Sequence, residues 1–279
     1  MANLKPVWNV VLNVYDQYAL VCNRLGLRHW VAYGTLLGTV RHKGFIPWDD
    51  DFDVFMPRED YERFLQLAES ELPKYLKIVT WWNTKEYDYA FSKVQDSRRD
   101  VYDHVTRESG TDQPQGIYID VFPIDGVAPT MIGRLRERLL RTYAYSRETA
   151  LFRKGRHRGW KGWLGEWMGI LLNVVGYGLK TPKDFDRYRE LLATRYKLSG
   201  SSRCGFYFTL QGGWEWTANT SVFDDTVMLP FMDRQVPAPK GWHEFLSNMY
   251  GDYMTPPPES ARKSVHWGEA PWKFGPTGM

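Results

Sequence analysis

The sequence contains few cysteines, carries little net charge and has no long uninterrupted apolar segment. Only Cys22 and Cys204 are cysteines among its 279 residues, which is too few for a disulfide framework or a cysteine-ligated zinc site. The cytoplasm is therefore the expected compartment, and residues 1–6 lack the apolar core of a signal peptide. The formal net charge of +3 gives no reason to expect a nucleic acid partner.

The most apolar stretch, residues 160–179, is interrupted by Lys161, Glu166 and Asn173 and is too polar for a membrane span. A basic stretch that begins at Arg134 precedes it. Two interpretations remain open for residues 134–179. They could make peripheral contact with the inner, anionic face of a membrane, as a basic helix followed by a Trp-rich one. They could instead form a solvated helix followed by a buried helical hairpin.

The pattern of apolar residues predicts an α/β (α+β) fold with a mixed sheet. Residues 7–25 repeat with the period of an amphipathic helix that Gly26 ends, and Cys22 lies on its apolar side. Further helices are expected after Thr35, as N-cap, and from Glu59. Residues 131–197 favour helices, whereas residues 200–279, rich in Gly, Pro and aromatics, favour irregular chain. Strands are expected over residues 28–33, 52–56, 76–82, 89–95 and 117–122.

The most informative segment runs from Trp48 to Val54 and holds four aspartates within five residues. Such a cluster repels itself unless a cation lies among the carboxylates. On a strand, Asp51 and Asp53 point to the same face, and two hard oxygen ligands on one face suit Mg²⁺ or Mn²⁺. The alternative is a solvated acidic turn, which the interleaved aromatic residues disfavour. The first two aspartates of the run, Asp49 and Asp50, are expected either to support the metal ligands from behind or to shape the loop.

Two further patterns supply partners for this pair. Gly34 and Thr35 lie where a strand turns into a helix, so that a phosphate can approach the backbone and the N–H groups of the helix start. Asp120 is a single acid within an apolar strand, and burying it costs on the order of several kcal/mol unless it is paired or binds a cation. It is therefore either a third metal-facing carboxylate or a cap for a neighbouring turn.

Together these motifs resemble the nucleotidyltransferase fold, in which a strand, a Gly-Ser/Thr turn and a helix precede Asp-x-Asp on the next strand and a third Asp on a later one. More closely, the sequence resembles the LicD family of phosphotransferases, to which fukutin-related proteins look related. The similarity is dense over residues 25–125 and patchier over residues 225–270. The segments that carry it are Tyr33–Val54, Phe91–Asp96, Tyr118–Asp125 and Leu246–Pro257.

The resemblance implies a nucleotidyltransferase-like catalytic core over residues 1–127, with a mixed sheet flanked by helices. Residues 128–279 would be a helical and irregular elaboration packed on it, for binding donor or acceptor. The implied reaction transfers phosphocholine, or a similar phospho-alcohol, from CDP-choline or another CDP-alcohol to a hydroxyl of a cell-surface glycan. That glycan would belong to lipopolysaccharide, teichoic acid or capsule.

The resemblance also assigns roles to the residues of the site. Asp51 and Asp53 would bind Mg²⁺ or Mn²⁺, which polarises the phosphoryl group and neutralises the leaving nucleotide. Asp120 would be a further metal ligand, or the base that accepts the proton of the acceptor hydroxyl. Gly34 and Thr35 match the substrate-binding turn of the family.

Cations and aromatic residues complete the predicted site. The cations nearest in sequence to the acids are Arg41, Lys43 and Lys93, each either a phosphate ligand or a solvated surface charge. A choline group would need an aromatic cage, because quaternary ammonium groups bind to π faces. His266 falls where LicD-like chains often carry a histidine. The cage candidates, each of which could instead fill the core, are Trp48, Trp81, Trp82, Tyr89 and the segment Trp214-Glu215-Trp216, which is favoured because an acid lies between two tryptophans.

Two other functions remain open at this point. One is nucleotidyl transfer from a nucleoside triphosphate to a small hydroxyl compound, which would release pyrophosphate where the first reaction releases CMP. The other is a glycan- or choline-binding module with a degenerate, non-catalytic site. The presence of aspartate at all three positions, 51, 53 and 120, argues against the second alternative.

Overall fold

The structure, a computed structural model, describes residues 4–84, 87, 89, 91–101, 115–140, 181–206 and 217–262. By their contacts the described residues divide into two compact units. The first unit draws on residues 1–86, 91–124 and 221–279, and the second on residues 87–90 and 125–220. The domain boundary expected after residue 127 stays a prediction.

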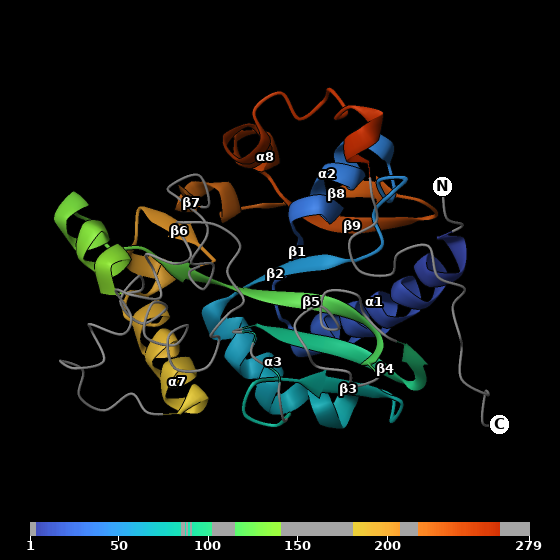
Figure 1. The fold of residues 1–279 in the computed structure, drawn as a ribbon, viewed down its shortest axis with the longest axis horizontal. Coiled ribbons are helices and arrows are strands. Elements are labelled where there is room, and N and C mark those ends of the chain that lie inside the picture. Colours follow the sequence, from blue (N-terminus) through green and yellow to red (C-terminus); the bar gives the residue numbers. More distant parts are fainter. Residues whose placement is uncertain are drawn as a thin grey trace. The chain divides into compact units, whose positions relative to one another are not determined.

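Helix α1, Lys5–Leu25, begins the first unit and is colored dark blue in Figure 1. Pro6 lies in its first turn, where no N–H group is required. Gly26 ends the helix in the left-handed conformation at φ 63°. The buried face runs from Val7 to Cys22, so the periodicity predicted this helix correctly and the Cys22 thiol packs in the core.

Five strands of the first unit form a mixed sheet in the order β1-β2-β5-β4-β3 (Figure 1). Strands β2 and β5 are parallel, and each of the other neighbouring pairs is antiparallel. Helices accompany this sheet, which confirms the predicted mixed α/β class. The strands are β1 Trp30–Val31, β2 Asp53–Pro57, β3 Leu76–Val79, β4 Ser92–Val101 and β5 Gln115–Gly126, and helix α3 covers Arg58–Glu71.

Strand β5 continues through Pro123, where a strand over residues 117–122 was expected to end. The N–H of Asp120 donates to the carbonyl of Phe52, the residue just before β2, so the odd-numbered residues of β5 direct their N–H groups toward β4. Pairing with β4 ends at Val121, opposite Ser92. Position 123 would direct its N–H toward β4, but β4 does not extend that far. A proline at this position therefore loses no hydrogen bond, and β5 keeps its pairing with β2.

A hairpin follows later in the chain, where the composition predicts irregular structure. Strands β8, Thr226–Phe231, and β9, Arg234–Pro239, form a two-stranded antiparallel sheet joined by a two-residue turn. Its prolines, at positions 230, 237 and 239, all fall on alternate pairs of the ladder. Those pairs exchange no hydrogen bonds across the hairpin, so proline is tolerated at each of them. Helix α8, Trp242–Tyr250, comes next.

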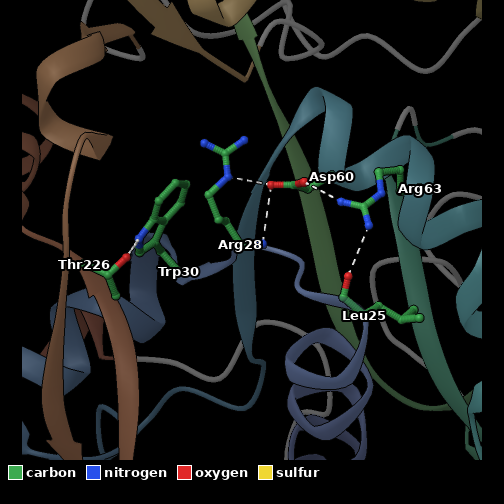
Figure 2. A network of polar contacts seen from close by, with 6 residues as sticks. All are labelled: Leu25, Arg28, Trp30, Asp60, Arg63 and Thr226. Atoms are coloured by element: carbon green, nitrogen blue, oxygen red, sulfur yellow. Dashed lines mark hydrogen bonds and ion pairs between the residues drawn. The ribbon is translucent and has the colours of Figure 1, made fainter.

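The hairpin packs against the start of the chain and so belongs to the first unit. The ring of Phe231 is buried, with centroids 5.0 Å from Phe45 and 5.4 Å from Phe52. Trp30 Nε1 donates a hydrogen bond of 2.8 Å to Thr226 Oγ1, as Figure 2 shows. Through these contacts the hairpin packs against the segment that precedes β2.

The second unit contains a short sheet and two described helices. The end of β5 pairs with β6, Arg203–Gly205, which pairs with β7, Thr217–Asn219. Helix α7, Pro182–Ala193, begins with a capping box formed by Thr181 and Asp184, and a second helix spans residues 131–140. The 3₁₀ turns of the two units are Leu198–Gly200, Thr220–Phe223 and Glu259–Ala261.

The predicted membrane contact falls largely outside the described residues, because residues 141–180 are not among them. Among the described helices, each is either too short or too polar to traverse a bilayer.

Candidate active site

The turn into helix α2, Tyr33–His42, fixes the backbone of the acidic strand. The predicted N-cap at Thr35 is wrong: the helix begins after Ala32, and Thr35 is its third residue. In that position Thr35 Oγ1 accepts a hydrogen bond of 2.8 Å from the N–H of Asp53, and Ala32 N donates to the Asp53 carbonyl at 2.9 Å. A hydroxyl in the first turn therefore positions Asp53 instead of capping the helix.

Gly34 permits a carboxylate to lie against the start of α2. A methyl group at position 34 would come within 2.7 Å of Asp49 Oδ2. The backbone of Asp49 is held by Trp8 Nε1, which donates to its carbonyl at 2.8 Å, and by the carbonyl of Ile46, also at 2.8 Å. The close approach that Gly34 was expected to offer a phosphate is thus made here by a side chain of the acidic run.

Asp53 and Asp120 lie side by side on the parallel strands β2 and β5, where they are register partners. Both are buried, at 7% and 6% exposure. On the other side of β5, Lys93 is the register partner of Asp120, and its Nζ lies 3.2 Å from Asp120 Oδ1. Three adjacent strands thus bring together two carboxylates and an ammonium, and Asp51 lies in the loop just before β2.

Lys93 is 3% exposed, and its ammonium also lies 3.2 Å from the centroid of the Tyr118 ring. An ammonium buried this deeply needs a negative charge or a π face beside it. Lys93 on β4 has both, because the Asp120 carboxylate and the Tyr118 ring both belong to β5. Of the two roles predicted for Lys93, this burial excludes a solvated surface charge, and the geometry places its ammonium beside Asp120. Phosphate binding by Lys93 stays a prediction.

Tyr250, the last residue of α8, was missed by sequence reasoning. Desolvation of its hydroxyl, and then the negative charges of Asp53, Asp49 and Asp51, raise the pKa of that hydroxyl, while Arg41 acts in the opposite direction. Tyr250 therefore lies in the field of these three aspartates. Tyr250 lies in the LicD-like segment Leu246–Pro257, but the resemblance was not used to assign this tyrosine a role.

Arg41 and Arg262 form the cationic side of the site. Arg41 Nη1 donates to the Tyr253 carbonyl at 2.8 Å, and its Nε donates to His42 Nε2 at 2.9 Å. Burial and the charge of Arg262 lower the pKa of Arg41. Trp48 lies between Arg262 and His42, the hydrogen-bond partner of Arg41: its ring centroid is 5.2 Å from Arg262 Cζ and 6.4 Å from the His42 ring centroid. Arg262 has no sequence signal of its own.

Lys43, the other predicted cation, caps the end of α2. It is exposed and adopts the left-handed conformation at φ 53°. Its carbonyl accepts a hydrogen bond of 2.6 Å from the N–H of Met232 in the hairpin turn. The backbone of Lys43 thus ties the insert between α2 and β2 to the hairpin, and its side chain remains at the surface.

Two comparisons with known proteins bear on these residues. A family model described as LicD/FKTN/FKRP, nucleotidyltransferase domain, matches residues 26–135, which include Gly34, the acidic run and Asp120. The chain is 30% identical over 268 residues to the lipopolysaccharide cholinephosphotransferase LicD of Haemophilus influenzae, across 94% of this chain and 95% of that protein. The chain belongs to the LicD family.

Shorter matches connect this LicD-family chain to two uncharacterised proteins. One, from Rickettsia typhi, is 42% identical over 52 residues, which is 19% of this chain and 16% of that protein. The other, from Rickettsia prowazekii, is 33% identical over 76 residues, or 27% of this chain and 26% of that protein.

The acidic residues of this LicD-family chain fit a divalent ion of the kind that binds together with a phosphate. Within the described ranges no group of three or more His, Cys, Asp or Glu side chains is suited to holding a metal ion. Mg²⁺ in phosphoryl-transfer sites, however, commonly uses one or two carboxylates and takes its other ligands from substrate phosphate and water. The adjacent carboxylates of Asp53 and Asp120 are such a donor set.

Four predicted site residues lie outside the described residues, and their roles stay predictions. These are Trp214, Glu215 and Trp216 of the proposed choline cage and His266.

Proposed function

We propose that this LicD-family chain transfers phosphocholine, or a similar phospho-alcohol, from a CDP-linked donor to a hydroxyl of a cell-surface glycan, with Mg²⁺ or Mn²⁺. The observation that carries the proposal is the match, over 94% of the chain, to a protein named as a lipopolysaccharide cholinephosphotransferase. The neighbouring carboxylates of Asp53 and Asp120 support it, because a charged diphosphate donor is bound most readily through a divalent cation.

In the proposed reaction the oxygen of the acceptor hydroxyl attacks the phosphorus that bears the choline. The bond between that phosphorus and the bridging oxygen breaks, and CMP leaves with the electron pair. The hydroxyl proton passes to a base. Such a transfer depends on alignment and charge stabilisation more than on covalent catalysis, which suits a site built on three rigid neighbouring strands.

Asp53 and Asp120, with Asp51 from the preceding loop, are the residues that would hold the ion. When bound, the ion supplies positive charge against the diphosphate. Thr35 keeps the Asp53 backbone in place through its 2.8 Å hydrogen bond. Lys93 compensates the charge of Asp120 and fixes its carboxylate, which leaves Asp120 either a ligand or the acceptor of the hydroxyl proton.

Arg41 and Arg262 are the residues that we assign to the phosphates of the donor. Guanidinium groups form paired hydrogen bonds with phosphate oxygens, and two such groups near one another are stabilised when an anion binds between them. Arg262 Cζ lies over one face of the Trp48 ring, 5.2 Å from its centroid, so a choline group would have to use the opposite face of that ring.

The experiment uses the full chain with CDP-choline, CDP-ethanolamine, CDP-glycerol or CDP-ribitol, an oligosaccharide acceptor and Mg²⁺, and measures release of CMP. We expect CMP from at least one donor. In a parallel binding measurement, CDP-choline should raise the thermal unfolding midpoint only when Mg²⁺ or Mn²⁺ is present.

The same assay decides between this proposal and nucleotidyl transfer, which the description of the matching family model favours. Release of pyrophosphate from a nucleoside triphosphate, together with no CMP from any CDP-alcohol, would replace the proposal with nucleotidyl transfer. Binding of CDP-choline or glycan without release of either product would replace it with a non-catalytic binding module.

A further inference from the structure

The helix over residues 131–140, the unlabelled green helix in Figure 1, exposes four large apolar side chains. Their exposures are 77% for Met131, 81% for Ile132, 54% for Leu135 and 62% for Leu139. With 100° between successive residues, these four positions fall within one arc of about 100°. A continuous apolar stripe on a surface helix marks a contact with something other than water.

Arginines flank this stripe on both sides. Arg138 lies about 20° beyond one edge of the arc and Arg136 about 40° beyond the other. Both are exposed, and neither has an ion-pair partner in the described part of the chain. Glu137, the only acid between residues 131 and 140, points the opposite way and is 1% exposed. The outer face therefore has an apolar centre and basic edges.

Hydrogen bonds join the first turn of the helix to the residues that precede it. Thr130 caps it, with Oγ1 accepting a 3.0 Å hydrogen bond from the N–H of Gly133. Arg134 Nη1 donates to the carbonyls of Ala128 at 3.3 Å and Pro129 at 3.1 Å. Arg134 thus serves the attachment of the helix, in contrast to Arg136 and Arg138.

We propose that this face, made by Met131, Ile132, Leu135 and Leu139 with Arg136 and Arg138, lies on the surface of an anionic lipid bilayer. In that position the apolar stripe enters the boundary between headgroups and acyl chains, and the arginine side chains extend to the lipid phosphates.

Other occupants fit these charges and exposures less well. A nucleic acid or an acidic protein surface would pair with the arginines but would leave four apolar side chains against polar groups. A symmetric contact between two copies would bring each copy's arginines toward the other's. The bilayer inference does not depend on the proposed function, although a lipid-anchored glycan acceptor would be reached from the same surface.

The test is sedimentation of the full chain with vesicles of phosphatidylcholine alone or mixed with phosphatidylglycerol. We expect binding to the anionic vesicles that weakens as salt is added. The double variant Arg136→Gln/Arg138→Gln should bind roughly 30-fold less tightly, from about 1 kcal/mol per arginine at an anionic surface. Leu135→Gln/Leu139→Gln should also weaken binding.

Leu191→Gln is the matched control, because Leu191 is a leucine of similar exposure, 63%, on α7 of the same unit. It should bind vesicles as the unchanged chain does. Failure of the unchanged chain to bind, equal binding to neutral vesicles, or an equal effect of all three variants would overturn the inference. So would a shift of oligomeric state that accompanies the two double variants.

The control readouts separate this inference from the proposed function. All three variants should keep the thermal unfolding midpoint and the release of CMP with a water-soluble oligosaccharide acceptor. If CMP is never released by any form, the proposed function fails while vesicle binding still decides the membrane surface.

Discussion

Asp60 and Asp120 are equally buried, at 6% exposure each, but the charges around them differ. Asp60 lies in the first turn of α3, where the helix dipole favours a negative charge. Its Oδ2 accepts a 2.7 Å hydrogen bond from Arg28 Nε, and its Oδ1 lies 3.5 Å from Arg63 Nη1. Arg63 also donates to the carbonyl of Leu25 at 3.1 Å, as Figure 2 shows.

Asp120 lies beside another acid. Asp53 is its neighbour on β2, and Lys93 approaches from β4. Two cations and a helix terminus surround the single carboxylate of Asp60, so this cluster serves stability. The like charges held together at the Asp120 edge support the ligand site proposed there, because an added cation lowers the energy most in such a buried place.

The largest expected effect comes from removing one acid of the Asp53–Asp120 pair. Asp53→Asn should reduce CMP release roughly 1000-fold, the scale seen when a group that stabilises transition-state charge is removed. The thermal unfolding midpoint should stay the same or rise, because one of two adjacent like charges is lost. Asp51→Asn should act in the same direction. Unchanged turnover in Asp53→Asn would show that the acidic edge binds no catalytic ion.

Acidification should lower the free energy of unfolding through His29, the residue next to Arg28. Burial lowers the pKa of His29 from 6.5 to about 4, partly offset by a hydrogen bond to the Leu27 backbone. Below pH 6.5 the unfolded chain takes up a proton that the folded chain does not. The free energy of unfolding is therefore highest above pH 6.5 and falls as the pH is lowered toward 4, by about 3 kcal/mol in total.

Urea unfolding at several values of pH measures this loss. His29→Gln should remove most of the dependence on pH between 6.5 and 4, because its side chain cannot be protonated there. A variant that keeps the full dependence would assign the loss to other groups.

A smaller effect on stability is expected at Asp60. Asp60→Asn should lower the free energy of unfolding by about 2 kcal/mol, less than for a fully buried pair, because both arginines are half exposed. CMP release per folded molecule should be unchanged, in contrast to Asp53→Asn. Arg63→Met, which removes a cation that is 51% exposed, should cost less than Asp60→Asn. A loss of turnover without a loss of stability in Asp60→Asn would remove the distinction between the two acids.

The smallest effect is expected where the Asp60 cluster meets the hairpin. Thr226→Val removes the acceptor of the Trp30 Nε1 hydrogen bond and should lower the free energy of unfolding by about 1 kcal/mol. Thr226→Ser keeps the hydroxyl and should restore most of it. Equal stability of the Val and Ser variants in urea would show that the packing of Trp30, and not this bond, attaches the hairpin.

Sequence reasoning found the parts of the site that local pattern determines. An acid within an apolar strand is unusual enough to single out Asp120, and the dense acidic run singles out Asp51 and Asp53. The order of the main elements also follows from periodicity. The predicted bounds of β5 and the predicted cap of α2 were wrong, because the roles of Pro123 and Thr35 depend on distant segments. Pro123 lies beyond the end of the pairing with β4, and Thr35 binds the backbone of Asp53.

The remaining features depend on contacts between distant segments. Tyr250 comes to the acids, and Arg262 comes to Arg41 and Trp48, from the far end of the chain. No local pattern at either position indicates these contacts. The hairpin escaped prediction because proline normally argues against strands. Its three prolines are compatible with a hairpin only because all three lie at pairs that exchange no hydrogen bonds. The sequence alone does not reveal the register that puts them there.

The placement of these prolines also affects whether another chain can add a strand to the hairpin. Residues at the alternate pairs of the hairpin direct their backbone groups away from the partner strand. Two of the three such positions on β9 are prolines, at 237 and 239, and one of the three on β8 is proline 230. An exposed strand edge commonly recruits further strands and starts aggregation. With half of its outward N–H groups missing, this hairpin makes a poor template for that growth.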